Sequence, residues 1–136
     1  MAEEKVLNMD GVAEDAAAAE KATEAAKKEK EIGSYTHTFK RPFLWKGRAF
    51  EQLTFDWETL TGRDHLEIES EMLLKGRTLV TPAFTGDFLV GMAARACTER
   101  DRQGKRVVDM QAVTEMPLAD FETITRKAQV FLLRAE

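Results

Sequence analysis

With 136 residues, 43% of them hydrophobic, the chain is long enough to bury the core of one domain. Its net charge of -4 arises in residues 1–31, which hold nine acidic and five basic side chains; residues 32–136 hold fifteen of each, so no overall field favours nucleic acid or an anionic membrane. The single cysteine cannot form an internal disulfide, and the acidic N-terminus has no apolar signal segment. No apolar run approaches the roughly 18 residues that a membrane span needs. These features predict a soluble cytosolic protein.

Residues 1–33 form the first predicted segment, a disordered or transiently helical tail. The stretch AEDAAAAEKATEAAKKEKE consists almost entirely of Ala, Glu and Lys, which favour helices, and Glu24 and Lys28 stand at helical spacing. It has no large apolar side chain to bury, and a helix without tertiary packing is marginal in water. We therefore expect a single ordered domain over residues 34–136.

Residues 35–57 are predicted to form a β-hairpin. The stretch YTHTFKR (35–41) is rich in Thr and aromatic residues, as strands are, and Pro42 is expected to end the strand or lie at an edge. Lys46-Gly47 offers the positive φ that a hairpin turn requires. Alternation divides the second strand, residues 49–57, into one face with Ala49, Glu51, Leu53 and Phe55 and another with Phe50, Gln52 and Thr54. Leu53 and Phe55 are the best core candidates.

The first helix after the hairpin is predicted from its capping signals. Thr61 and Asp64 stand at capping-box spacing, with Asp in place of Glu, and Gly76 is a natural stop. The apolar residues at helical spacing are Leu66, Ile68, Met72 and Leu73.

A second helix is predicted from about Thr85 to Asp101. One row on it comprises Phe84, Phe88 and Met92, and beside that row lie Leu89, Ala93, Ala96 and Cys97. Residues 99–106 are expected to form a charged loop and residues 107–116 one short helix or turn. After Pro117 a last helix carries a wide apolar stripe, formed by Leu118, Phe121, Ile124, Ala128, Phe131 and Leu132. These elements predict an α+β fold, in which an N-terminal β-hairpin packs on a small bundle of three to four helices.

No catalytic, cofactor or metal site is predicted, so the chain is not expected to be an enzyme. His37 and His65 are not grouped with cysteines or carboxylates at ligand spacing, and Cys97 lies on an apolar helix face, as a buried inert thiol does. Glutamates at 67, 69 and 71 are two apart, so a solvated face explains them better than a carboxylate pair. The glycine-rich motifs that bind phosphate are absent.

The basic loop Arg100–Arg106 suggests an alternative function, that of a small nucleic-acid-binding or regulatory protein. Phosphate binding needs several cations on one surface, and Asp101 and Asp109 dilute the charge here. A solvated turn is the favoured interpretation, and nucleic acid is not expected as a partner.

Surplus Phe, Leu and Met leave two interpretations of the apolar surface. A small neutral domain with more apolar surface than it can bury invites a partner helix. Alternatively, the hairpin and the helices simply cover one another. Val130 and Leu133 lie off the apolar stripe of the last helix, so this helix has more apolar surface than one partner face needs. The sequence as a whole favours the two interpretations about equally.

The order of several short motifs bears on this choice. Phe39-Lys40-Arg41-Pro42, Gly47, Leu53-Thr54-Phe55 and Thr61-Gly62-Arg63-Asp64 are followed later by LVGMAA (89–94) and MPLADF (116–121). Over roughly residues 36–133 this order resembles small phage tail assembly chaperones, the Mu-like and P2-like proteins encoded just before the tape measure gene. The sequence departs from the family at residues 55–58, at residues 75–85 and in its longer tail.

The resemblance implies a non-catalytic role, in which the protein binds and shields the tape measure protein during tail morphogenesis. Further partners that the resemblance implies are the tail tube protein and a frameshifted longer form of this chain, and a homo-oligomer stays open. The resemblance also implies that the protein is located in the cytoplasm of the bacterial host and is absent from the mature virion. The residues expected to contact a partner are Trp45, Trp57, Phe84, Phe88, Met92, Val130, Phe131 and Leu133. For Trp45 and Trp57 a core position is the alternative.

Overall fold

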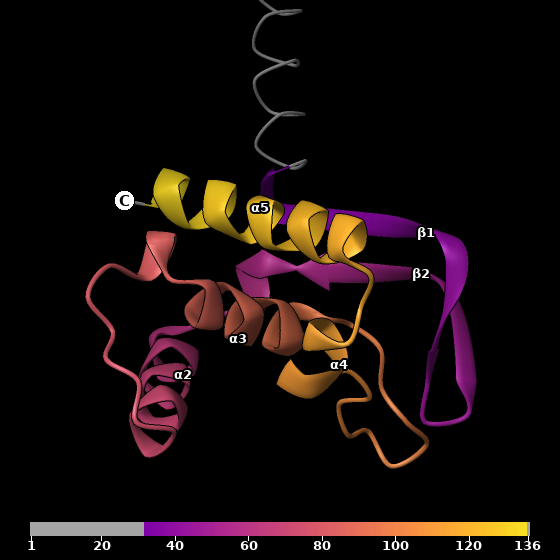
Figure 1. Ribbon diagram of the computed structural model, residues 1–136, viewed down its shortest axis with the longest axis horizontal. Helices are drawn as coiled ribbons and strands as arrows, with labels where there is room; N and C mark the ends of the chain where they lie inside the picture. Colours follow the sequence, from indigo (N-terminus) through magenta and orange to yellow (C-terminus); the bar gives the residue numbers. More distant parts are fainter. Residues whose placement is uncertain (1–31, 136) are drawn as a thin grey trace, which may run out of the picture. The chain divides into compact units, whose positions relative to one another are not determined.

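The computed structural model describes residues 32–135, which form an α+β fold with a β-hairpin followed by helices, as predicted (Figure 1). In chain order the elements are β1 (Ser34–Trp45), β2 (Arg48–Asp56), the 3-10 helix η1 (Trp57–Thr59), α2 (Gly62–Leu74), the 3-10 helix η2 (Pro82–Phe84), α3 (Gly86–Ala96), α4 (Met110–Thr114) and α5 (Leu118–Ala135). The predicted tail lies almost wholly outside the described residues. Within residues 32–135 no helix is both long and apolar enough to cross a membrane.

The hairpin turn forms where the sequence predicts it. Strands β1 and β2 pair antiparallel up to Trp45 and Arg48, and the turn residues Lys46 and Gly47 have φ angles of 48° and 77°. Positive φ at both positions is the geometry of a type I′ turn, whose twist matches that of the flanking strands.

A register shift divides the hairpin. Pro42 lies within β1, which is an edge strand of the two-stranded sheet, as one of the two predicted alternatives has it. Thr38 pairs with Gln52 and Phe43 pairs with Phe50, so the four residues 39–42 of β1 stand opposite Glu51 alone. This bulge accommodates a proline that a regular ladder would exclude, so β1 continues past it. It also breaks the alternation of β2. Phe50 and Leu53 are both buried, and the predicted assignment of Phe50 to the opposite face is wrong.

Helix α2 begins and ends as its sequence signals predict. The backbone N–H of Thr61 donates to Asp64 Oδ2 at 2.8 Å, which is the reciprocal half of a capping box. At the other end, Gly76 has a φ of 74°, its N–H donates to the Leu73 carbonyl, and the Arg77 N–H donates to the Met72 carbonyl. These two bonds form a Schellman motif, which satisfies carbonyls that the helix end leaves free.

Helix α3 lies at the centre of the domain, with α5 and the hairpin on one side and α2 and α4 on the other (Figure 1). It ends at Ala96, earlier than predicted, because the chain turns into an extended segment. Cys97 forms a bridge with Phe55, and the Thr98 N–H donates to the Thr54 carbonyl at 2.9 Å. The backbone after α3 therefore pairs briefly with β2.

The last two helices follow the sequence prediction in position but not in every buried residue. Asp109 accepts a hydrogen bond from the Ala112 N–H at 2.8 Å and caps α4, the short helix expected between residues 107 and 116. On α5, Ile124 and Ala128 are fully buried, whereas Leu118 is exposed. Leu66 and Leu73 of α2, also predicted in an apolar stripe, are exposed as well, because only the face of Ile68 and Met72 meets α3.

Gly91 sets how closely α2 and α3 approach. A Cβ at this position would lie 2.6 Å from Ile68 Cγ2, and Ile68 is a buried side chain with a stiff branched Cβ. We expect Gly91→Ala to destabilise the protein by about 1–2 kcal/mol in urea unfolding, since overpacking outweighs the gain in helix propensity. Gly86→Ala, with open space around its Cβ, is the control and should be neutral or stabilising. A Gly91→Ala variant as stable as the wild type would contradict the close contact.

Candidate binding site

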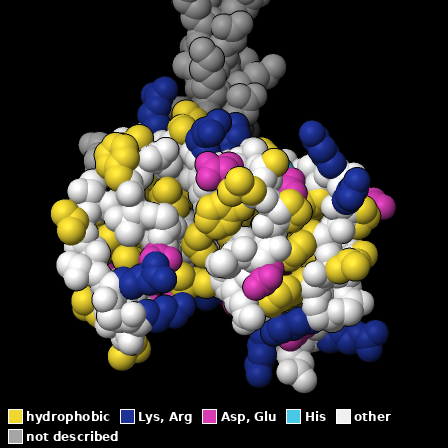
Figure 2. Space-filling view, in the orientation of Figure 1, with side chains coloured by type: hydrophobic (Ala, Val, Ile, Leu, Met, Phe, Trp, Pro, Cys, Tyr) yellow, Lys and Arg dark blue, Asp and Glu magenta, His cyan; other side chains and the backbone are white. Residues whose placement is uncertain are grey.

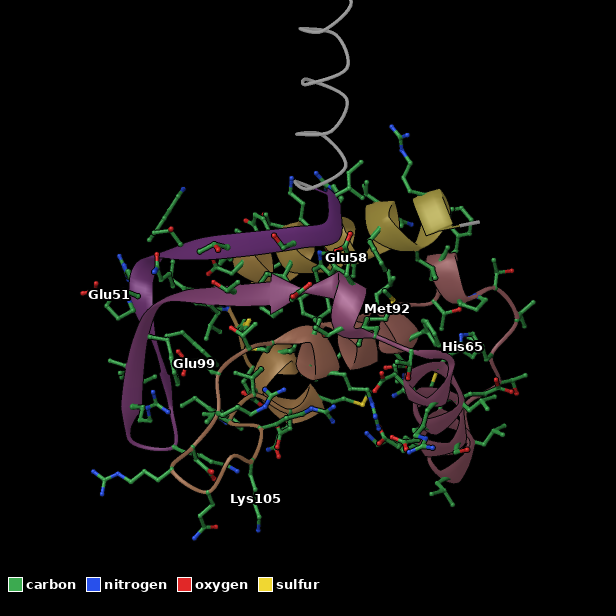
Figure 3. The ribbon with its side chains drawn as sticks, turned by 180° about the vertical axis from the view of Figure 1, so that it is seen from behind. Glu51, Glu58, His65, Met92, Glu99 and Lys105 are labelled. Carbon is green, nitrogen blue, oxygen red and sulfur yellow. The ribbon has the colours of Figure 1, made fainter. Side chains whose placement is uncertain are left out.

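A half-open apolar pocket lies between α2, α3 and the C-terminal half of α5. Its volume is about 180 Å³, and it is lined by Leu60, Thr61, Asp64, His65, Ile68, Phe88, Met92, Phe131 and Leu132. Figure 3 shows His65 of α2 and Met92 of α3 near one another at this site. Three of the residues predicted to contact a partner therefore meet in one place: Phe88, Met92 and Phe131.

The wall of the pocket follows from helical spacing. Phe88 and Met92 are one turn apart on α3 and point toward α2, where the His65 ring packs against Phe88 with centroids 4.8 Å apart. His65 Nε2 also lies 3.6 Å from a Glu69 carboxylate oxygen on the same helix. The pocket thus has an apolar floor and a polar rim contributed by α2.

Exposed apolar side chains from η2 and α5 lie at the same end of the domain. Phe84, Leu133 and Val130 are 71%, 44% and 39% exposed. Gln129 Nε2 donates to the Ala83 carbonyl at 2.8 Å and holds η2 against α5. Phe84 therefore sits beside the part of α5 that carries Val130 and Leu133. We call Phe84, Val130 and Leu133 the apolar patch.

The other candidate residues differ in burial, and for Trp57 the core alternative holds. Trp57 is fully buried and stacks on Phe55 with ring centroids 5.6 Å apart, so it is part of the core and is not a partner anchor. Phe88 and Met92 are buried and line the pocket. Trp45 is half-buried near the hairpin turn, where it stacks on Phe43, and lies outside the pocket.

A second apolar surface was not predicted. Leu66, Leu73 and Leu74 project from the face of α2 that turns away from α3, and all three are exposed. The sequence places Leu66 and Leu73 within one apolar stripe of α2, and periodicity alone does not say which side of a wide stripe is covered.

Charged side chains join α2 to α3 next to the pocket. Arg95, only 11% exposed, donates to Asp64 at 3.1 Å, to Glu71 at 2.9 Å and to Glu67. Burial would by itself raise the pKa of Asp64, but hydrogen bonds from Thr61 and Arg95 to its charged form outweigh this and hold the pKa below its ordinary value. The carboxylate pattern that sequence reasoning assigned to a solvated face is thus partly an interhelical ion-pair network.

A hydrogen-bonded chain of side chains links β1 to α5. His37, which is buried, donates from Nε2 to Asp120 Oδ1, and its Nδ1 is hydrogen-bonded to the Tyr35 hydroxyl, each at 2.7 Å. Burial and the nearby charge of Asp120 raise the pKa of Tyr35, so the phenol stays protonated near neutral pH. This arrangement fixes the start of α5 on the hairpin. It was missed because Asp120 is distant in sequence.

Metal and thiol chemistry find little support in the described part of the chain. Residues 32–135 contain no group of three or more His, Cys, Asp or Glu side chains placed to hold a metal ion. Cys97 is buried, as predicted, and burial raises the pKa of its thiol above the ordinary value. The structural features that remain to be explained are the pocket and the exposed apolar side chains.

Comparisons with protein-family models, with curated proteins and with solved structures find no match to this chain.

Proposed function

We propose that this protein is a phage tail assembly chaperone, which binds apolar helical segments of the tape measure protein without catalysis and shields them during tail assembly. The observation that carries a binding role is the pocket between α2, α3 and α5, with the apolar patch at the same end of the domain. The resemblance to tail assembly chaperones supplies the identity of the partner.

The size of the pocket favours protein side chains over a small-molecule ligand. Pockets for cofactors and drug-sized ligands measure about 300–1,000 Å³. A pocket of about 180 Å³ instead suits one or two apolar side chains that project from a neighbouring helix. Helix-in-groove recognition uses such anchors at positions i, i+3 or i+4, with flanking apolar contacts outside the pocket. Phe84, Val130 and Leu133 would supply those flanking contacts.

The modest size of this surface agrees with temporary shielding. A holdase must leave when tube subunits polymerise, so each of its contacts has to be weak. Many copies bound along one long helical chain protect it together, even though each copy dissociates readily.

Charge substitutions in the apolar patch provide the test. The protein is co-expressed with the long tape-measure-like protein of the same locus, whose soluble fraction is measured. We expect Phe84→Asp with Leu133→Asp to weaken co-purification about 30-fold, the loss of a binding hot spot of about 2 kcal/mol. Both positions are exposed, so the core should tolerate the change.

The matched control replaces two leucines that are exposed elsewhere, Leu44→Asp with Leu118→Asp. It should keep wild-type solubility and co-purification. Equal losses in both variants would mean that general surface hydrophobicity matters and would contradict a specific site. If the long protein remains insoluble with the wild-type chain, the chaperone role itself fails.

A further inference from the structure

Two segments that are far apart in the sequence and rich in basic side chains meet in the fold: the hairpin turn and the loop between α3 and α4. Arg48, next to the turn, forms an ion pair with Glu99 at 3.5 Å, and this contact ties the hairpin turn to the loop between α3 and α4. Figure 1 shows that loop beside the turn, and Figure 3, which labels Glu99 and Lys105, shows the same arrangement from behind. In Figure 2, Lys and Arg side chains gather there, at lower right.

Five cations of the hairpin and of this loop are exposed and form no ion pair within residues 32–135. They are Lys40 and Arg41 in the bulge, Lys46 in the turn, and Arg102 and Lys105 in the loop. We call these five residues the basic end.

The acidic groups nearby are largely engaged. Glu99 pairs with Arg48, and Asp101 Oδ1 accepts the backbone N–H groups of Gln103 and Lys105 at 2.8 and 2.9 Å. Glu51 stands opposite the bulge and lowers the positive field there. Asp101 keeps its negative charge, because backbone N–H groups do not neutralise a carboxylate. Five unpaired cations against the carboxylates of Glu51 and Asp101 still leave the surface positive, although residues 32–136 are neutral as a whole.

The loop is also held in a fixed shape. Arg100 and Arg106 pair across it as an isolated β-bridge, the Asp101 N–H donates to the Lys105 carbonyl, and Gly104 takes a φ of 78°. Arg102 and Lys105 therefore project from an ordered turn. An ordered cationic surface loses less entropy on binding than a flexible one.

We infer that the basic end binds the phosphate backbone of duplex DNA without sequence specificity. Phosphate recognition needs several cations on one surface. The fold brings the hairpin turn to the loop, and the bulge of the same hairpin adds two more cations farther from the turn. A two-stranded ribbon is also narrow enough to enter the major groove, which favours a duplex over a single strand. The basic end contains no residue of the pocket or of the apolar patch, so the inference is independent of the proposed chaperone role.

Fluorescence anisotropy with a labelled duplex of mixed sequence, titrated with the full chain at several salt concentrations, tests the inference. If all five cations contact phosphates, the slope of log affinity against log salt is about -4.5, which corresponds to a loss of about 500-fold between about 50 and 200 mM salt. Lys40→Ala with Arg41→Ala, and Arg102→Ala with Lys105→Ala, should each reduce the steepness of the slope by about 2.

The control variant Arg126→Ala with Arg134→Ala removes two exposed cations of α5 and should keep the wild-type slope. Because all these side chains are exposed, thermal unfolding monitored by circular dichroism should be unchanged. The inference is overturned if the duplex does not bind at low salt, if both basic-end variants keep the wild-type slope, or if a single strand or polyglutamate of equal charge binds more tightly than the duplex.

Discussion

Replacing Trp57 with alanine is expected to lower the free energy of unfolding by about 4 kcal/mol, the range found for large aromatic residues removed from a core. Trp57 is fully buried at the end of β2, stacks on Phe55 and belongs to the same core as α3. The cavity that alanine leaves would be enclosed by the hairpin and α3, neither of which can collapse freely. Urea unfolding followed by far-ultraviolet circular dichroism measures the loss.

The variant Trp57→Phe separates the packing of Trp57 from its polar atom, and Trp45→Ala serves as a comparison. Its indole Nε1 is buried without a hydrogen-bond partner, so Trp57→Phe loses some volume but also removes an unsatisfied donor. Its cost should be well below that of alanine. Trp45→Ala, at a half-buried position, should also cost less. A Trp57→Ala variant with near-wild-type stability and a selective loss of partner binding would restore the anchor role that the structure excludes.

Arg95→Ala is expected to lower the free energy of unfolding by about 2 kcal/mol, less than for a fully buried ion pair, because Glu67 and Glu71 are nearly half exposed and screened by solvent. The guanidinium is nearly buried and contacts three carboxylates of α2, at positions 64, 67 and 71. Without Arg95, these carboxylates repel one another along one side of the helix. Arg95→Met, which keeps most of the apolar stem, separates the loss of charge from the loss of packing.

The pH dependence of stability distinguishes loss of the ion pair from loss of packing as the cause of the Arg95→Ala effect. The pKa of Asp64 is lowered in the folded protein, so its contribution to stability is fully present above its ordinary pKa of about 4 and is lost as the pH falls through the lower folded-state value. The stability difference between the wild type and Arg95→Ala should therefore be constant near neutral pH and shrink below about pH 4. A difference that stays constant down to pH 2 would assign the effect of Arg95 to packing.

Local signals allowed the sequence to predict much of the fold. The turn at Lys46-Gly47, the Thr61–Asp64 capping box and the stop at Gly76 depend on neighbouring residues, and the structure confirms all three. The order of the hairpin and the helices followed from their contrasting periodicities. The α+β class was predictable for the same reason.

The errors concern features that depend on tertiary contacts. The burial of Phe50 depends on a bulge in the opposite strand, and the early end of α3 depends on pairing between Cys97 and Phe55. Which side of an apolar helix is covered depends on its neighbours, so the exposure of Leu66 and Leu118 was missed.

The candidate site was predictable in part. Sequence reasoning selected Phe84, Val130 and Leu133, which the structure places on the surface at one end of the domain, and Phe131, which lines the pocket. It also selected Trp57, which is in the core, because a tryptophan favours a core or an interface about equally. Sequence reasoning found the basic loop but not its meeting with the hairpin, because the two segments are about fifty residues apart and meet only through the fold.

Amide hydrogen exchange of the co-purified complex with the tape measure protein provides the decisive comparison with the free chain. We predict slower exchange in the C-terminal half of α5 and just after η2, with unchanged exchange at the hairpin turn and in residues 99–106. Protection confined to the hairpin and that loop, with α5 unaffected, would contradict a partner site at the pocket and the apolar patch.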